Sequence, residues 1–332
     1  MIALIAEFMG LLAVIFVCSL VLSEAVERLA ERWGSNFSGS ILLGLVTVLP
    51  EYLIVFWAVW GGEYRGALGS ATGAATMLMT LGFGLVIVTA TTRLSKHPVK
   101  AIHLSKTTRI DALYLFLTAI AAVSLGLFGG GLSALDGALL FLLYAAYAVH
   151  LYIDARKKGS EHHAAGKKPP KVRWALVGLA VSGIAIILVS EPFVRAMEQL
   201  ADRIGVSRMA IFVVLSPIAS EMPEKLTAFI TVRRRGSLAE ISVCNFIGSV
   251  VNHNSLLLGI MPFVAMLRGQ PGFIPGIVVP AFWMMTCLTL IGSFSLALGQ
   301  LRRWQGALFA ALYVVLIAVA YFSANAELVM TH

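Results

Sequence analysis

The 332-residue sequence has little charge and little cysteine. Only 13% of its residues are Asp, Glu, Lys or Arg, whereas about 25% is usual for a soluble protein, and 59% are apolar, with a mean hydropathy of +0.88. This composition excludes a water-soluble domain, a disordered chain and a fibrous protein. The apolar runs are long and continuous rather than short and alternating, which excludes an outer-membrane β-barrel and predicts a helical membrane protein.

The three cysteines and the basic net charge point to no further chemistry. Cys18, Cys244 and Cys287 lie within apolar runs without neighbours at metal-ligand spacing, so we interpret them as packing residues. The net charge of +8 comes from Lys and Arg beside apolar runs, which is typical of cytoplasmic loops rather than of a nucleic-acid-binding surface. We expect membrane lipids and transported cations as partners, no nucleic acid and no cofactor. The oligomeric state stays open, and a monomer is compatible with the sequence.

Apolar segments long enough to cross a bilayer occur ten times, since a spanning helix needs about 20 residues. We predict an all-α integral membrane protein with ten transmembrane helices, at residues 3–24, 38–60, 66–90, 110–128, 132–153, 173–192, 207–230, 238–265, 275–298 and 304–324. A basic linker at 156–172 divides the chain into two five-helix halves, at 1–155 and 173–332. The first apolar run leads directly into a span, so we expect no removable signal peptide.

Lys and Arg are distributed unevenly between the two sides of the membrane. Nineteen of them lie in or beside the loops after odd-numbered spans and five after even-numbered spans, while Lys225 lies within the seventh span. Because positive residues mark the cytoplasmic side, we predict a multi-pass protein of the cell's inner (plasma) membrane with both termini outside. Two homologous halves with five spans each would have opposite orientations, as in many secondary transporters.

The order of polar features is the same in the two halves. A Pro-Glu pair ends a polar stretch in the second predicted span, at 47–51 (TVLPE), and again in the seventh, at 220–224 (SEMPE). A cluster of glycine and small residues follows each, at 69–74 and at 245–249. We therefore predict two inverted five-helix repeats. Close approach of a second helix is expected at Gly69, Gly73, Gly248 and Ser249.

Three acidic residues fall near the middle of predicted spans: Glu51, Glu221 and Glu224. A carboxylate at the bilayer centre costs on the order of 2.5–3.5 kcal/mol, so each needs a cation, a proton or a basic side chain opposite it. Pro50 and Pro223, each within a predicted helix, remove a backbone hydrogen bond and free main-chain carbonyls. Such carbonyls are tolerated at membrane depth where they line a cavity or bind something. Carboxylate, carbonyl and hydroxyl oxygens form the all-oxygen set that Ca²⁺ prefers.

At these residues the chain resembles the cation/calcium antiporter superfamily, which includes the sodium/calcium exchangers. Members have ten helices in two inverted halves, each with a Thr-Ser-x-Pro-Glu motif followed by a Gly-Ser-Asn-x-x-Asn motif. The resemblance implies that Glu51 and Glu224 are the two central acidic ligands of the transported metal ion. It also implies that Thr47, Ser220 and Ser249 are cation-binding hydroxyls.

The sequence departs from the family pattern at several positions. Val48 and Glu221 stand where the first motif has serine, and the second motif of the first half is reduced to Gly73-Ala74-Ala75. Thr72 and Thr76 are the alternative oxygen ligands there. The lower oxygen count argues against several Na⁺ sites.

Three residues near Glu224 bear on the counter-ion. Glu221 is a candidate cation ligand, but it can also pair with Lys225 four residues later on the same helix face. His253 could exchange protons near neutral pH, with Asn252 as an auxiliary ligand. Together these residues favour proton coupling over sodium coupling.

Structural roles remain open alternatives for the same residues. Glu51 could be a hydrogen-bonded structural acid, Glu224 could pair with Lys225, and His253 and Asn252 could be packing or interhelical hydrogen-bonding residues. A cation channel or a membrane-embedded enzyme are alternatives from other classes, but we find no filter-like repeat, no Asp- or His-rich motif and no nucleotide-binding loop. We expect a secondary antiporter, not an enzyme, that exports Ca²⁺ or a related cation in exchange for H⁺ or Na⁺ by alternating access. A Na⁺/H⁺ or other divalent-cation exchanger of the same fold stays open.

Overall fold

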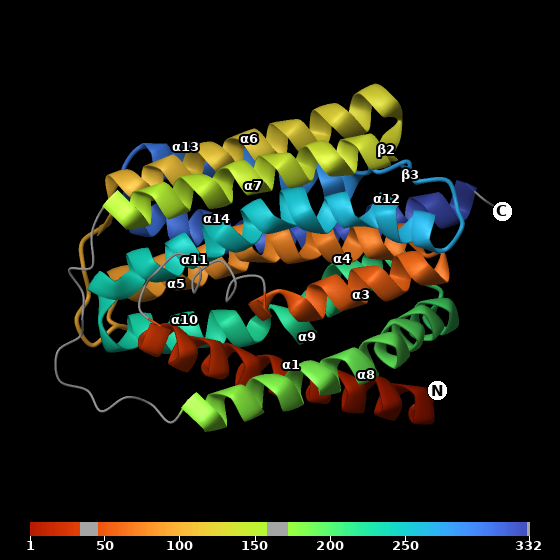
Figure 1. The fold of residues 1–332 in the computed structure, drawn as a ribbon, viewed down its shortest axis with the longest axis horizontal. Helices are drawn as coiled ribbons and strands as arrows, with labels where there is room; N and C mark the ends of the chain where they lie inside the picture. Colours follow the sequence, from red (N-terminus) through yellow and green to blue (C-terminus); the bar gives the residue numbers. More distant parts are fainter. Residues whose placement is uncertain (34–45, 158–171, 331–332) are drawn as a thin grey trace.

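The structure is a computed structural model that describes residues 1–33, 46–157 and 172–330. It is a bundle of helices packed side by side (Figure 1), as predicted for a helical membrane protein. Residues 38–45 of the second predicted span and 158–171 of the predicted linker at 156–172 lie outside the described residues.

The α-helices are α1 (Ile2–Trp33), α3 (Leu49–Gly61), α4 (Tyr64–Met77), α5 (Phe83–Thr91), α6 (Lys106–Gly129), α7 (Ala134–Lys157), α8 (Val172–Ile204), α9 (Arg208–Ser220), α10 (Met222–Arg234), α11 (Ala239–Asn252), α12 (Leu258–Leu267), α13 (Pro280–Ala297) and α14 (Arg303–Met330).

Seven helical segments in the described part of the chain are long and apolar enough to cross a membrane. They are Ile2–Val26, Tyr64–Thr91, Thr108–Gly129, Ala134–Asp154, Arg173–Ile204, Gly236–Leu267 and Pro280–Ala297. Three shorter apolar helices, Leu49–Gly61, Arg208–Ser220 and Arg303–Val319, lie at three further predicted spans. The structure thus supports a multi-pass membrane protein, and the count of ten spanning helices stays a prediction.

The predicted continuous span at 207–230 is wrong, because Glu221 separates two helices, α9 and α10. Pro223 occupies the first turn of α10, where its missing N–H removes no helical hydrogen bond. Pro50 has the same place in the first turn of α3. Both prolines therefore begin helices, rather than interrupting continuous ones as the sequence suggested. Each Pro-Glu glutamate accordingly lies in the first turn of a short helix.

The spans predicted at 66–90 and 238–265 contain a matching irregularity. In the first, the 14-residue helix α4 continues into a π-helix, η1 (Leu78–Gly82), before α5. In the second, the 14-residue helix α11 continues into a π-helix, η3 (His253–Leu257), before α12. A π-turn leaves the regular hydrogen-bond ladder and is frequent at functional sites.

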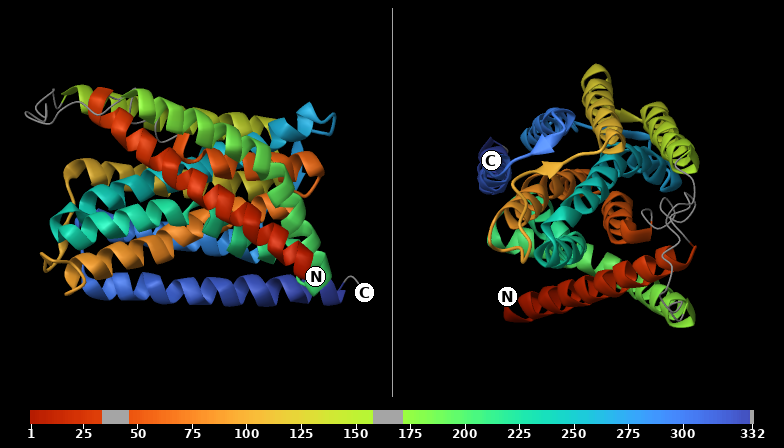
Figure 2. Two further views of the ribbon diagram at one scale, coloured as in Figure 1. Left: turned by 90° about the horizontal axis from the view of Figure 1, so that it is seen from below. Right: turned by 90° about the vertical axis from the view of Figure 1, so that its left-hand side faces the viewer.

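The most buried of the candidate spanning segments, Tyr64–Thr91 and Gly236–Leu267, lie in the interior of the bundle. The two longest helices, α1 and α8, pack along each other and cover one face, while α6, α7 and α13 lie on the opposite face (Figures 1 and 2). The two chain ends lie at the same end of the bundle, and the α5–α6 connection lies at the other (Figure 1). Two chain ends on the same side agree with an even number of membrane crossings by the chain.

The described residues also contain two short antiparallel strand pairs. The all-α prediction did not include them. At one end, β1 (Ile102–His103) pairs with β4 (Gln300–Leu301). At the other, β2 (Gly131–Ser133) pairs with β3 (Phe273–Pro275). A 3₁₀ turn, η2 (Gly236–Leu238), joins α10 to α11.

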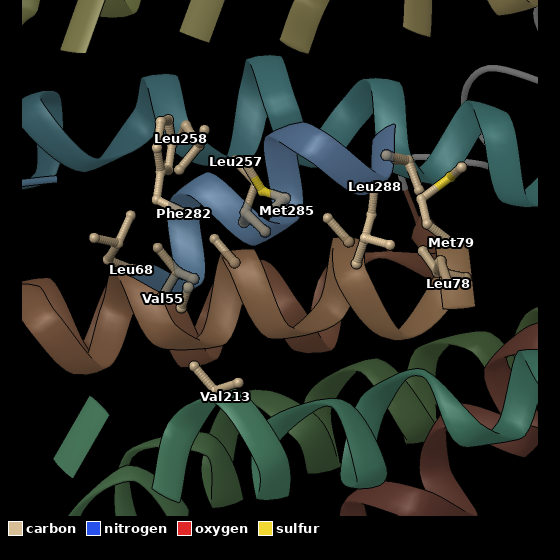
Figure 3. Close-up of a cluster of buried hydrophobic side chains, with 14 of the residues drawn as sticks. Val55, Leu68, Leu78, Met79, Val213, Leu257, Leu258, Phe282, Met285 and Leu288 are labelled. Atoms are coloured by element: carbon tan, nitrogen blue, oxygen red, sulfur yellow. The ribbon is translucent and has the colours of Figure 1, made fainter. Parts of the chain in front are cut away.

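A continuous apolar core surrounds these central helices. Phe282, Met285 and Leu288 of α13 lie between α4 on one side and the η3–α12 segment on the other (Figure 3). Val55 and Val213 extend the cluster to α3 and α9. Because this interior is filled by apolar side chains, each buried charged group within it requires a specific explanation.

Helices α4 and α9 approach each other closely because α4 has glycine at the contact. A Cβ atom at Gly73 would lie 2.2 Å from the Val213 carbonyl oxygen, and one at Gly69 would lie 2.8 Å from the Met209 carbonyl oxygen. The predicted close packing is confirmed at these two positions. It is wrong at Gly248, where a Cβ would meet only the Tyr147 hydroxyl oxygen at 3.6 Å, an ordinary contact.

We expect Gly73→Ala to destabilise the protein, because the added methyl group would force α4 away from the α9 main chain. Overpacking of this kind costs about 1–3 kcal/mol. The change should lower the melting temperature measured on purified protein in detergent. Gly248→Ala is the matched control and should melt close to wild type; equal melting of the two variants would contradict the helix contact.

Candidate functional site

Glu51 is a buried carboxyl group with unsatisfied hydrogen-bonding capacity. It lies in the first turn of α3, is 2% exposed, and its Oε2 atom has no hydrogen-bond partner among the described residues. Its side chain interacts with the hydroxyl group of Ser220 at the end of α9. The N-terminus of α3 favours a negative charge at this position, but buried charged groups normally also have a counter-charge.

Glu224 occupies the corresponding place in α10, but it lies in a more open environment. Its Oε1 atom accepts a hydrogen bond of 2.7 Å from the Asn245 amide and one of 3.5 Å from the Ser249 hydroxyl, both on α11. Glu224 is half-buried and Asn245 is exposed. Glu51 is therefore enclosed, whereas Glu224 lies nearer to the surface of the bundle.

The structure brings the three predicted acidic residues into one region. The charges of Glu221 and Glu224 both act on the Glu51 carboxyl, and the charge of Glu221 also acts on Glu224. These residues come from the start of α3 and from the break between α9 and α10, which contact each other. Three carboxylates in a low-dielectric interior repel one another unless cations or protons neutralise them.

Lys225 neutralises one of these carboxylates. Its Nζ atom lies 3.2 Å from Glu221 Oε2 and also donates to the Glu221 carbonyl oxygen at 3.2 Å. His253 Nε2 lies 3.4 Å from Glu221 Oε1. All three side chains are at most 2% exposed. The predicted pairing of Glu221 with Lys225 is confirmed, and it leaves Glu51 and Glu224 as the acids without a basic partner at salt-bridge distance among the described residues.

The sequence also matches a known protein family over most of its length. The family model described as sodium/calcium exchanger protein matches residues 3–153 and 174–322, which is most of the chain. The chain belongs to the sodium/calcium exchanger family. The resemblance inferred from the Pro-Glu motifs is thereby confirmed. Members of this family are transporters rather than enzymes.

Individual relatives of this exchanger-family chain are distant but cover nearly its whole length. An uncharacterized membrane protein of Methanocaldococcus jannaschii is 24% identical over 88% of this chain and 89% of its own length. A Ca²⁺/H⁺ antiporter of Aphanothece halophytica is 22% identical over 91% of this chain and 86% of its own length.

Two solved structures share the fold. The H⁺/Ca²⁺ exchanger CAX has a TM-score of 0.79 at 21% identity, covering 98% of this chain and 86% of its own. The sodium-calcium exchanger NCX_Mj has a TM-score of 0.65 at 24% identity, covering 96% and 98%.

The two threonines predicted as substitute ligands in this exchanger-family chain are both buried in α4. The Thr72 hydroxyl donates to the Leu68 carbonyl oxygen at 2.8 Å, and the Thr76 hydroxyl donates to the Thr72 carbonyl oxygen at 2.6 Å. Each hydroxyl oxygen keeps lone pairs after donating its hydrogen. Both hydroxyl oxygens can therefore still accept a hydrogen bond or bind a cation. Among the described residues, neither hydroxyl forms a hydrogen bond with one of the glutamates.

The remaining predicted residues have different surroundings. Thr47 is half-buried one turn before Glu51, in the described segment that leads into α3. The Asn252 Oδ1 atom accepts a hydrogen bond of 2.7 Å from the Tyr52 hydroxyl, so this oxygen already links α3 to α11. Asn254, in η3, is fully buried, and neither its Nδ2 nor its Oδ1 atom has a hydrogen-bond partner among the described residues.

Sequence reasoning did not select Asn245 or Tyr52 as site residues. Asn245 precedes Ser249 by four residues, so both lie on the same face of α11 and reach the same Glu224 oxygen. That spacing was a usable signal. Tyr52 gave no such signal, because its partner Asn252 lies 200 residues away.

The donor set of this exchanger-family site consists mainly of oxygen atoms. It comprises the carboxyl groups of Glu51 and Glu224 with the nearby hydroxyls of Ser220 and Ser249. Within the described ranges, no group of three or more His, Cys, Asp or Glu side chains is arranged to hold a metal ion. A cation bound between the two glutamates would therefore need hydroxyl, carbonyl or water oxygens to complete its coordination.

Proposed function

We propose that this chain is a secondary active antiporter that exports Ca²⁺ or a related cation in exchange for H⁺. In this proposal the protein has ten spans in two inverted five-helix repeats, lies in the plasma membrane and has both termini outside. Glu51 and Glu224 bind the transported cation, and the hydroxyls of Ser220 and Ser249 assist.

The observation that carries the proposal is the Oε2 atom of the enclosed Glu51, which has no hydrogen-bond partner among the described residues. Glu224, whose charge acts on Glu51, has no basic partner at salt-bridge distance within the same part of the chain. Leaving a buried carboxylate oxygen unsatisfied is costly, and two neighbouring carboxylates add repulsion. A bound divalent cation or two protons would each remove both costs. A site that is satisfied equally by a metal ion or by protons is suited to exchanging one for the other.

Calcium is favoured as the cargo because the available ligands are oxygens and because three of the similar proteins are named for it. Carboxylate, hydroxyl and carbonyl oxygens suit Ca²⁺, which accepts a flexible arrangement of ligands. The Aphanothece protein and the CAX structure are both named for exchange of Ca²⁺ with H⁺. The membrane lipids and transported cations remain the expected partners.

Protons are favoured over Na⁺ because Lys225 already supplies a fixed positive charge next to Glu221. That carboxylate needs no Na⁺ ion to balance it. The oxygen ligands that remain are few, which disfavours several separate Na⁺ sites. Two carboxyl groups without basic partners can instead accept protons when the cation leaves.

Alternating access in this proposal uses the long pair α1 and α8. These helices pack along each other (Figure 2) and contact α3 and α10, which hold Glu51 and Glu224, and α9, which ends directly before Glu221. A shift of the pair relative to the rest of the bundle would expose the glutamates first to one side of the membrane and then to the other.

The test is radiolabelled Ca²⁺ flux in proteoliposomes containing the purified protein. We expect uptake to be driven by a pH gradient alone, with no Na⁺ present, and to saturate without channel-like conductance. Protein-free vesicles under the same gradient are the control. Uptake that requires a Na⁺ gradient and ignores pH would reverse the coupling, and absence of Ca²⁺ flux under either gradient would overturn the function.

A further inference from the structure

A basic hollow lies at the end of the bundle opposite to the two chain ends. It has a volume of about 700 Å³ and is lined by residues of the segment before β1 and of the start of α14. Lys100, Arg302 and Arg303 supply its positive charge, and Trp304 forms part of its wall. The distribution of Lys and Arg predicts that this end is cytoplasmic.

The local fold holds these basic residues together. The antiparallel pairing of β1 with β4 aligns Ile102 with Leu301. Lys100, two residues before Ile102, and Arg303, two residues after Leu301, line the same hollow. The Gln305 side chain accepts a hydrogen bond of 2.7 Å from the Arg302 N–H, so the start of α14 is capped. The hollow is therefore built from a strand pair and a capped helix start rather than from an isolated loop.

None of the described residues that line the hollow is acidic. Among the described residues, Lys100, Arg302 and Arg303 also form no salt bridge. Elsewhere in the described chain, arginines such as Arg28, Arg195 and Arg208 do pair with nearby acids. The hollow thus presents unbalanced positive charge that fits an anionic ligand.

An apolar groove of about 440 Å³ adjoins the basic hollow and shares Trp304 with it. It runs between the end of α13 and the first turns of α14, where Phe294, Leu298 and Leu308 line it. Phe294 is 69% exposed and belongs to α13, a helix apolar enough to cross a membrane, and Leu298, which directly follows α13, is 60% exposed. Tryptophan is enriched where the hydrocarbon meets the headgroups, and Trp304 lies at that boundary between groove and hollow.

From this adjacency we propose that the hollow and the groove together bind one anionic phospholipid from the cytoplasmic leaflet. Its phosphate lies between Lys100, Arg302 and Arg303, where arginine can form paired hydrogen bonds to phosphate oxygens. One acyl chain lies in the groove between α13 and α14. Cytoplasmic leaflets contain anionic lipids, and basic hollows between spanning helices on that side suit their headgroups. Free phosphate would use the hollow but gain nothing from the groove.

The test measures lipid binding on the full-length protein in detergent, independently of transport. Wild type is titrated with phosphatidylglycerol, phosphatidylcholine or inorganic phosphate, and binding is followed by the melting temperature and by native mass spectrometry. We expect phosphatidylglycerol to raise the melting temperature and remain bound, and the other two to have no such effect. Arg302→Gln with Arg303→Gln should weaken the phosphatidylglycerol effect about 30-fold in concentration, since each basic residue near an anionic lipid contributes on the order of 1 kcal/mol.

Two controls separate the site from general charge and from folding. Arg233→Gln with Arg234→Gln removes two arginines from another basic segment and should bind the lipid like wild type. Phe294→Ser changes only the groove and should weaken phosphatidylglycerol binding while leaving the arginines intact. Equal binding by the Arg302/Arg303 variant and wild type, or an equal effect of inorganic phosphate, would overturn the proposal.

Discussion

Replacing Glu51 by Gln should abolish Ca²⁺ uptake and leave the folded protein at least as stable as wild type. The substitution keeps the volume and one carbonyl oxygen but removes the negative charge that a cation would neutralise. Removing one partner of a buried charge pair costs about 3–5 kcal/mol, which corresponds to a loss of cation affinity of roughly 100- to 4,000-fold. Uptake in proteoliposomes under a pH gradient measures the first effect, and the melting temperature measures the second.

The stability measurement decides between the two interpretations of Glu51. A structural acid holds its surroundings together, so its replacement would lower the melting temperature. A cation ligand whose Oε2 atom has no protein partner is itself a source of instability when the site is empty, so the same change should be neutral or stabilising. Glu24→Gln is the matched control, because the Glu24 side chain is 63% exposed and pairs only with Arg28 one turn away among the described residues. Normal uptake by Glu51→Gln would defeat the assignment.

The helical fold could be predicted from the sequence because it depends on long apolar segments. Composition and the length of the apolar runs located the helices of the bundle, but both Pro-Glu pairs were interpreted as lying within continuous spans, so the starts of α3 and α10 were not predicted. The sequence did not reveal that α9 and α10 are separate helices, since Pro217 and Pro223 are compatible with either a kink or a break. The π-helices η1 and η3 were also not predicted, because no residue type marks where the backbone changes from α-helical hydrogen bonds to the wider ones of a π-helix.

The candidate site was predictable where it depends on local spacing and not where it depends on distant contacts. The pairing of Glu221 with Lys225 follows from a separation of four residues on a helix, and the structure confirms it. The approach of His253 to Glu221 depends on how α10 and η3 pack, which no local pattern encodes. The same holds for the link between Tyr52 and Asn252. Whether Glu51 and Glu224 bind a cation together stays a prediction.

Replacing Lys225 by Met should convert the site into one that responds to Na⁺. In wild type the Lys225 ammonium group lies against Glu221 in the bundle interior. Its removal leaves a buried carboxylate without its counter-charge, a change that costs about 3–5 kcal/mol of stability. A small monovalent cation could then take the place of the ammonium group. We expect Na⁺ to raise the melting temperature of Lys225→Met relative to choline at equal ionic strength, and to leave wild type unchanged.

The double variant Glu221→Gln with Lys225→Met separates charge balance from packing. It removes both charges, so it should recover most of the stability lost in Lys225→Met, and Na⁺ should have no effect on it, because replacing a buried pair by neutral groups is often close to neutral. A Lys225→Met protein that is as stable as wild type and indifferent to Na⁺ would mean that the ammonium group does not balance Glu221. The argument for proton coupling would then lose its main support, because that argument treats Lys225 as a cation built into the chain in place of one drawn from solution.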